Sequence, residues 1–256
     1  MGKTLLFDAG NTNTKLCLAD DQGLNECYTL PTRPANTGDD WGLKIESILL
    51  REDVEPTDIE ACVISSVIPP LDPLIKSMAA RFLECECLFA GRDLTLDIDN
   101  EYAHPEQVGA DVLTGCYSAR MTYDEKNLIV VDFGTATTCA CIQGNAFKGG
   151  LICPGLLSSA SALASGTAKL PKVDLTVTSP TLHWGTSTAE CLNQGFVFGF
   201  ASMIDGLVEK LSAQLKDPFV IATGGLAPTI AQLSETINEL RPDLVMEGLW
   251  MAYYNR

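Results

Sequence analysis

Two stretches of the sequence, LLFDAGNT at residues 5–12 and IVVDFGTA at residues 129–136, are nearly the same stretch written twice. In each, an apolar run ends at an aspartate, one residue and a glycine follow, and a threonine comes within the next two positions. An apolar run that stops at a glycine turn is typical of a buried strand. Because the second copy begins just past the middle of the 256 residues, we predict a duplicated fold in which each half opens on such a strand.

The first of these turns, residues 8–15, brings together groups that suit a polyphosphate and its cation. Gly10 allows the backbone to approach an oxyanion closely, while Asn11 and Thr12 can donate hydrogen bonds. Lys15 supplies a positive charge, and Asp8 can hold magnesium directly or through water. A polar hairpin turn with an aspartate cap is the structural alternative. The second copy favours function, and the first hypothesis is a nucleotide held between two halves.

The composition argues against several classes of partner. The chain is 46% hydrophobic and 20% charged, which lies in the range of globular proteins, and its formal net charge is -16. An acidic field repels nucleic acid and anionic lipid, so small ligands or protein partners are expected instead. No apolar stretch approaches the roughly 20 residues needed to span a bilayer, and the first residues lead directly into a strand. We therefore expect a cytoplasmic protein that binds neither nucleic acid nor membrane.

The ten cysteines lie mostly inside apolar segments, where a free thiol behaves as a small hydrophobic group. We expect them to be reduced. Two Cys-x-Cys pairs, Cys85 with Cys87 and Cys139 with Cys141, lack a second Cys or His pair at the spacing of a zinc finger. A structural zinc site is therefore not expected.

Hydrophobic periodicity and breaker residues predict strands and helices that alternate along both halves. No linker rich in proline, serine or charge separates the halves, so we place a boundary near residue 117, giving domains 1–117 and 118–256. The predicted strands are 3–8, 14–19, 61–67, 86–89, 128–132, 138–142 and 219–223. The predicted helices are 41–50, 71–82, 109–123, 157–165, 187–211 as one helix or a pair, and 242–254.

The two turns, together with ATGGLA at residues 222–227, resemble the phosphate and adenosine elements of the superfamily of acetate kinases, sugar kinases and actin. More narrowly, the chain resembles the type III pantothenate kinases, and the matching segments follow the family's order from residue 4 to the C-terminus. These segments are residues 8–15, 64–69, 109–111, 132–138, 149–155 and 168–171, with Thr188 and Gly195.

This resemblance implies a fold and an activity. The fold would be α/β, with duplicated ribonuclease H-like domains of the actin-like ATPase type, each a mixed sheet flanked by helices. The activity would be the ATP-dependent phosphorylation of pantothenate to 4'-phosphopantothenate, the first step of coenzyme A biosynthesis. The resemblance also implies ATP, Mg²⁺ and a monovalent cation, K⁺ or NH₄⁺, as cofactors, and a homodimer with the substrate site at its interface.

The resemblance also implies roles for single residues. Asp111 would accept the proton of the substrate hydroxyl, Asp132 would bind the monovalent cation, and Asp8 would bind Mg²⁺ through the phosphates. The residues expected to contact ATP are Asp8, Ala9, Gly10, Asn11, Thr12, Asn13, Thr14, Lys15, Thr135, Gly224 and Gly225. Those expected to contact pantothenate are Tyr102, Gly109, Ala110, Asp111, Val112 and Thr188, the last at the dimer interface.

Two alternatives remain open at the acceptor side. Asp111 opens a predicted helix, where an aspartate also serves as a simple N-cap. The family pattern has arginine after Gly-Ala-Asp, whereas this chain has Val112. Loss of a cationic partner for the pantothenate carboxylate would cost ~2–5 kcal/mol unless Arg33, Arg120 or Lys148 replaces it. The alternative function is therefore a relative with an altered substrate or with lost activity, acting as a nucleotide-binding regulatory factor.

Overall fold

A computed structural model of the chain describes residues 2–33 and 35–255 and divides into two compact units. The first unit comprises Met1–Ile98, Ala103–Met121 and Leu244–Arg256, and the second comprises Asp99–Tyr102 and Thr122–Asp243. These units differ from the division predicted at residue 117. The chain enters the second unit for residues 99–102, returns to the first, and passes into the second again at residue 122. The helix over residues 244–254 belongs to the first unit.

The first unit is built on a five-stranded sheet with the order β3-β2-β1-β4-β5. β1, β2 and β3 form an antiparallel meander, while β4 runs parallel to β1 and β5 parallel to β4. The strands are β1 (Lys3–Ala9), β2 (Asn13–Asp20), β3 (Gly23–Pro31), β4 (Ile59–Ser66) and β5 (Glu86–Phe89).

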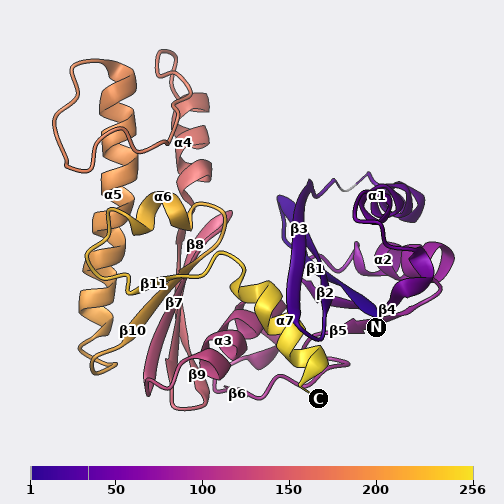
Figure 1. Cartoon of the computed structure of the whole chain (residues 1–256). Helices are drawn as coiled ribbons and strands as arrows, with labels where there is room; N and C mark the ends of the chain where they lie inside the picture. Colours follow the sequence, from indigo (N-terminus) through magenta and orange to yellow (C-terminus); the bar gives the residue numbers. More distant parts are fainter. Residues whose placement is uncertain (1, 34, 256) are drawn as a thin grey trace. The chain divides into compact units, whose positions relative to one another are not determined.

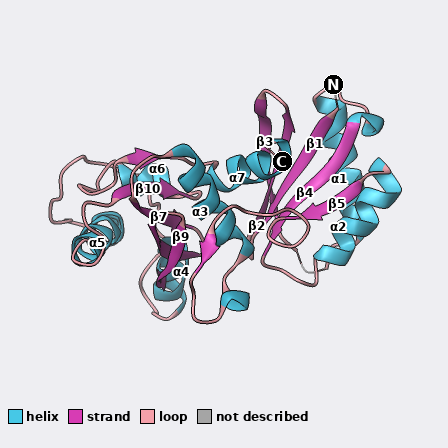
Figure 2. Cartoon of the chain, turned by 90° about the horizontal axis from the view of Figure 1, so that it is seen from below, coloured by secondary structure: helices cyan, strands magenta, loops and turns pink. Residues whose placement is uncertain are grey.

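Helices cover both faces of this sheet, because its strands alternate apolar side chains to each side. Phe7 packs in one core with α1 (Gly38–Arg51) and α2 (Asp72–Met78), which continues as a π-helical turn over Ala79–Leu83. Leu6 packs in the opposite core with residues of α3 (Ala110–Thr122) and α7 (Leu244–Tyr254). Figure 2 shows α1 and α2 along one side of β1, β4 and β5. Short 3-10 turns occupy Pro56–Asp58 and Pro105–Gln107.

The second unit contains a six-stranded sheet with the order β11-β10-β7-β8-β9-β6. Its strands are β6 (Asp99–Asn100), β7 (Asn127–Phe133), β8 (Ala136–Gln143), β9 (Ala146–Pro154), β10 (Phe219–Thr223) and β11 (Glu239–Leu240). Side chains of β7 and β8 form one core with α4 (Leu156–Ser165), α5 (Thr188–Leu211) and α6 (Ala227–Ala231). Figure 1 labels these elements along the chain.

The predicted duplication is confirmed strand by strand. Without its added β6, the second sheet reads β9-β8-β7-β10-β11, which repeats the order and directions of β3-β2-β1-β4-β5. β1 and β7 share the same pattern of buried and half-buried positions along their seven residues. Asp8 lies beside Ser65 of β4, and Asp132 lies beside Thr223 of β10. Each aspartate is therefore the next-to-last residue of the equivalent strand in its sheet.

The strands and helices predicted from periodicity are all present, although their ends differ by a few residues. The predicted helix over residues 71–82 is confirmed, with its last turn in the π form, and residues 187–211 form one helix. The prediction missed β3, β9, the short helix α6 and the two-residue strands β6 and β11. β3 and β9 lack a continuous apolar run, and their exposed positions reflect a place toward the edge of each sheet.

The expectation of reduced cysteines is wrong at one pair. Cys17 of β2 and Cys27 of β3 are directly opposite each other, with a Cα to Cα distance of 4.1 Å, and they form a disulfide. The other eight cysteines are free in the described structure. The disulfide therefore ties the outermost strand of the first sheet to its neighbour.

One helix of the described residues, α5, is long and apolar enough by length and composition to cross a bilayer. The expectation that no stretch approaches this length is wrong for α5. A buried core helix meets the same criterion. Val197, Ala201, Ile204 and Val208 of α5 lie in the core of the second unit, which accounts for the apolar character of that face.

Candidate active site

The first turn is the loop of the β1–β2 hairpin. Ala9 pairs with Thr14, so residues 10–13 form the loop, and the Gly10 N–H donates to the Asn13 carbonyl at 3.1 Å. Asp8 and Lys15 are opposite each other at the base of the loop. Asn11, Thr12 and Asn13 are exposed. The turn thus presents amide and hydroxyl donors at its tip, with one carboxylate and one ammonium group at its base.

Two residues of this predicted phosphate site have buried side chains. Ala9 is 1% exposed, and its carbonyl accepts a hydrogen bond from the Val67 N–H at 3.2 Å. Thr14 is fully buried, and its hydroxyl lies 2.8 Å from the hydroxyl of Thr32. Any contact that Ala9 or Thr14 makes with a phosphate therefore comes from the backbone.

Asp111 lies at the same edge of the first sheet as this turn. Gly109 precedes α3, and a Cβ placed on it would lie 2.3 Å from the Asp111 Oδ1 atom and 3.3 Å from Val67 Cγ1. Val67 directly follows β4, and it donates to Ala9 at the end of β1. Gly109 thus leaves the space that the Asp111 carboxylate occupies, beside the ends of the strands that carry the first turn.

The surroundings of Asp111 suit a proton acceptor. Burial raises the pKa of its carboxyl, and hydrogen bonds from the backbone N–H groups of Val112 and Asp111 itself partly oppose that shift. The Val112 N–H donates to Asp111 Oδ1 at 2.7 Å. A raised pKa strengthens a carboxylate as a base. Because α3 begins at Ala110, Asp111 lies within the first helical turn and is not the N-cap residue.

The second turn has a loop one residue shorter than the first. Phe133 pairs with Thr137, which leaves residues 134–136 as the loop, and the Gly134 N–H donates to the Ala136 carbonyl at 3.1 Å. This difference explains why Thr12 comes two residues after its glycine, whereas Thr135 follows its own glycine directly. Thr135 is exposed at the tip of the loop, as Thr12 is in the first turn.

Gly224 brings the second turn and the predicted adenosine turn into direct contact. Its φ angle is +90°, and a Cβ on it would lie 2.2 Å from Asp132 Oδ1 and 2.9 Å from the Phe133 backbone. At Gly225, a Cβ would meet nothing within 4 Å. Only glycine fits the first position without displacing the Asp132 carboxylate, whereas the second position is open.

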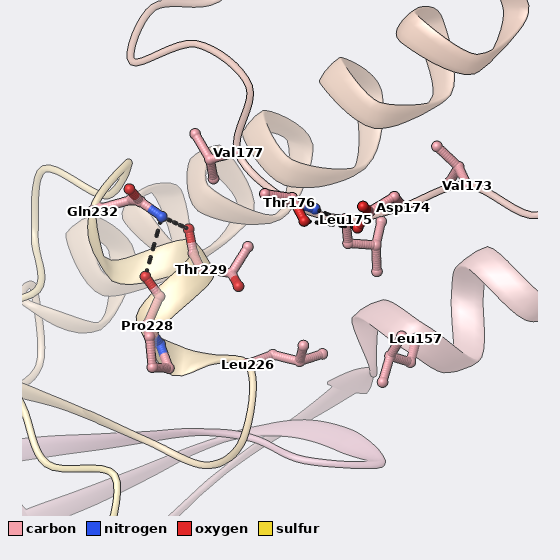
Figure 3. Close-up of a pocket in the computed structure, with 10 residues that line it drawn as sticks. All are labelled: Leu157, Val173, Asp174, Leu175, Thr176, Val177, Leu226, Pro228, Thr229 and Gln232. Atoms are coloured by element: carbon pink, nitrogen blue, oxygen red, sulfur yellow. Dashed lines mark hydrogen bonds between the residues drawn. The ribbon is translucent and has the colours of Figure 1, made fainter.

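A cavity of about 630 Å³ adjoins this glycine turn within the second unit (Figure 3). Leu226, Pro228, Thr229 and Gln232 border it on one side, and the segment 173–177 and Leu157 border the rest. The Gln232 side-chain amide donates to the Pro228 and Thr229 carbonyls at 3.3 and 3.2 Å. The lining combines apolar side chains with hydroxyl and carboxylate groups, which is typical of a small-molecule site.

The remaining predicted substrate residues lie in both units. Val112 follows Asp111 in the first unit, whereas Tyr102 and Thr188 belong to the second. The Tyr102 ring lies beside the Phe147 ring, with centroids 6.0 Å apart, and beside Gly149. Thr188 is the exposed first residue of α5, and its neighbours Ser187 and Ala189 border a cavity of about 440 Å³.

Metal binding at Asp8 or Asp132 would depend on ligands beyond the protein side chains. No group of three or more His, Cys, Asp or Glu side chains that could hold a metal occurs among residues 2–33 and 35–255. Mg²⁺ commonly binds through one or two carboxylates together with water and substrate phosphates. One carboxylate at the base of a phosphate turn therefore fits Mg²⁺ that arrives with a nucleotide.

Comparison with known proteins identifies the family. The family model for type III pantothenate kinase matches residues 4–210. The chain belongs to the type III pantothenate kinase family. A type III pantothenate kinase of Nitratidesulfovibrio vulgaris strain Miyazaki F is 46% identical over 254 residues, covering 98% of this chain and 97% of that protein.

Solved structures agree with the fold. The polyphosphate/ATP-glucomannokinase of an Arthrobacter species superposes with a TM-score of 0.53 at 11% identity, covering all of both chains. The activator of 2-hydroxyisocaproyl-CoA dehydratase from Clostridium difficile, solved with bound ADPNP, has a TM-score of 0.58 at 12% identity, covering 99% of this chain and 94% of that one. The predicted actin-like fold of the family is therefore confirmed.

Sequence reasoning did not identify the lining of the larger cavity. The sequence predicts only an extended loop from Pro171 to Pro180, and the alternation of apolar and polar residues over 173–177 does not show that this segment borders a cavity. Pro228 was the available signal, since proline is favoured in the first turn of a helix, and α6 begins at Ala227, two residues after Gly225.

Proposed function

We propose that this protein transfers the γ-phosphate of ATP to the primary hydroxyl of pantothenate and forms 4'-phosphopantothenate, the first step of coenzyme A biosynthesis. Family membership over nearly the whole chain supports this proposal. The observation that carries it is the placement of Asp111, a part-buried carboxylate with a raised pKa, at the sheet edge that also bears the first turn.

In the proposed reaction, Asp111 accepts the proton of the pantothenate hydroxyl as its oxygen forms a bond with the γ-phosphorus. The bond between that phosphorus and the bridging oxygen breaks, and ADP leaves with the electron pair. Phosphoryl transfer needs alignment and charge neutralisation more than covalent work by the protein. Asn11, Thr12 and Lys15 supply hydrogen bonds and positive charge to the phosphates, and Asp8 holds Mg²⁺ with them.

We assign the second turn and the cavity beside it to nucleotide binding. Asp132 would bind the monovalent cation, with Thr135 contacting the phosphates. The adenosine would occupy the cavity of about 630 Å³ next to Gly224 and Gly225. Its mixed apolar and polar lining supports a purine with an attached ribose, and Leu226 joins the glycine turn to the cavity wall.

On the acceptor side, pantothenate would contact Gly109, Ala110, Val112 and Tyr102, with Thr188 from a second copy. The Val112 side chain is uncharged and cannot pair with the pantothenate carboxylate. The proposal therefore requires a cationic side chain from elsewhere in the chain. Lys148 is already paired with Glu101 in the described structure. A role for Lys148 would therefore require that ion pair to open or to be shared.

A cytoplasmic homodimer is the assembly that we propose. Exposed apolar side chains in the second unit support it, because large apolar groups left in water favour association. Trp184 is 88% exposed, and Ile152 and Leu182 are also exposed.

A coupled assay of ADP release tests the function. With ATP, Mg²⁺ and K⁺ present, ADP should appear only when pantothenate is added. ADP release with another hydroxylated acceptor, but not with pantothenate, would point to an altered substrate. Nucleotide binding without turnover of any acceptor would point to a regulatory factor.

The variant Val112→Arg refines that assay. A new guanidinium near the carboxylate of the acceptor should lower the KM for pantothenate if the native pocket lacks a cation. No gain, with unaltered folding by circular dichroism, would show that another residue of this chain already binds the carboxylate.

A further inference from the structure

Thr32 is the first residue after β3, and it contacts the first turn at three atoms. Its backbone N–H donates to the Thr12 carbonyl at 2.9 Å, and its hydroxyl donates to the Gly10 carbonyl at 2.8 Å. The same hydroxyl lies 2.8 Å from the buried hydroxyl of Thr14. Thr32 is half-buried, and its neighbours in the turn are the residues assigned to phosphate binding.

The direction of these hydrogen bonds follows from the donor count. A hydroxyl has one proton to donate, and Thr32 gives its proton to the Gly10 carbonyl. The hydrogen bond between the two threonines must then run from Thr14 to Thr32. The result is a short chain in which Thr14 donates to Thr32 and Thr32 donates to Gly10, and each bond polarises the next.

These contacts fix the orientation of two peptide planes. In a trans peptide, the carbonyl of one residue and the N–H of the next point in opposite directions. Because Thr32 holds the Gly10 and Thr12 carbonyls, the N–H groups of Asn11 and Asn13 are directed away from Thr32. Backbone amides fixed in this way bind phosphate oxygens without reorganising when the ligand arrives.

The second turn is held in a related manner by a different element. The Ser158 hydroxyl of α4 donates to the Thr135 carbonyl at 2.8 Å, and a Cβ on Gly155 would lie 2.0 Å from the same oxygen. Both turns therefore have a carbonyl held by a hydroxyl from the segment that follows the third strand of the sheet. The repeat of this arrangement in two unlike sequences argues that the orientation of the turn matters.

We propose that Thr32 is a positioning residue for ATP, which orients the first turn so that the Asn11 and Asn13 amides face the phosphates. This inference rests on the proposed function of that turn. The test compares Thr32→Val, which keeps the shape and removes the hydroxyl, with Thr32→Ser, which restores it. Thr29→Val is the matched control, because Thr29 is exposed on β3, three residues before Thr32.

Loss of the hydroxyl should raise the KM for ATP about 3- to 10-fold, since a lost hydrogen bond changes an equilibrium by this order. The KM for pantothenate should stay unchanged, Thr32→Ser should recover the ATP value, and Thr29→Val should match the wild type. Thr14→Val, which removes the preceding donor, should give a smaller rise in the same parameter. Equal KM values for ATP in Thr32→Val and Thr29→Val would overturn the proposal.

Amide hydrogen exchange in the absence of nucleotide separates this inference from the proposed function. The Gly10 N–H, which donates to Asn13, should exchange faster in Thr32→Val than in Thr29→Val. A wild type that binds no ATP would defeat the proposed function, and the exchange rates would still report on the turn. Equal exchange rates in the two variants would show that Thr32 does not orient it.

Discussion

Asp111 shows how one carboxylate can be costly to the fold and useful to a reaction. Burial raises its pKa, so ionising this carboxyl costs more free energy in the folded protein than in the unfolded chain. Stability from an acid with a raised folded pKa is fully present below its unfolded pKa and is lost as the pH rises through the folded value. Wild-type Asp111 therefore destabilises the first unit at neutral pH.

Asp111→Asn should separate these two effects. The amide keeps the size of the side chain, so nucleotide binding should persist, while kcat should fall about 10²- to 10⁴-fold because the base is lost. The melting temperature at neutral pH should rise above that of the wild type, and the difference should vanish below the ordinary pKa of aspartate. Kinetics and thermal melts across pH measure both. Full turnover in the variant would refute the assignment of the base.

Among single residues, the sequence led to Asp111 through its match to a family motif. The reason why position 109 is glycine is visible only in the folded structure. Nothing in the residue order shows that a Cβ at position 109 would lie 2.3 Å from the carboxylate two residues later. The same holds for Thr32, because its three partners are about 20 residues away in the chain and become neighbours only when β3 pairs with β2.

Among the elements, the central strands were predictable and the outer ones were not. β1 and β7 are buried on both faces, so each appears as a continuous apolar run that ends at an aspartate. β3 exposes or half-exposes every position, and β6 and β11 have two residues each, so their stability comes from ladder partners that the local sequence does not specify. Residues 173–177 could not be placed from the sequence for the same reason, since the side-chain amide of Asn193 on α5 holds the Asp174 and Thr176 carbonyls.

The turn after β10 offers a matched pair of glycines for mutation. Gly224→Ala should destabilise the protein by about 1–3 kcal/mol, because its φ angle is +90° and the added Cβ meets Asp132 and Phe133. Gly225→Ala should leave the melting temperature unchanged, because its Cβ meets nothing within 4 Å.

The same two glycine variants also test whether the nucleotide binds next to this turn. If the nucleotide approaches Gly225 closely, Gly225→Ala should weaken nucleotide binding, measured by calorimetry, without a loss of stability. An equally stable Gly224→Ala variant would contradict the close contact with the Asp132 carboxylate.

At the scale of the whole molecule, the duplicated sheet order explains why the chain has two turns of the phosphate-binding type. The exposed apolar residues of the second unit bear on whether two copies of the chain associate. Trp184 is 88% exposed beside Leu182 at 66%, a far greater exposure than that of the core aromatic residues of the same unit. Covering such side chains with another surface lowers the free energy of the system, because apolar area is removed from water.

Sedimentation velocity should therefore give a mass about twice the 27.5 kDa of one chain. Trp184→Glu should shift the protein toward the monomer and lower kcat, because Thr188 of a second copy would no longer complete the substrate site. Leu50→Glu is the control, since Leu50 is 84% exposed on α1 of the first unit. A wild-type monomer with full activity would rule out the dimer.

The return of α7 to the first unit has a consequence for biosynthesis. Met246, Leu249 and Tyr253 fill the core that also contains Leu6 and Val63, so that core is incomplete until α7 has left the ribosome. The second unit uses residues 99–102 and 122–243 and can assemble earlier. The unit translated first is thus the last to close, and a nascent chain stalled before residue 244 should expose the apolar face of β1 and β4 to chaperones.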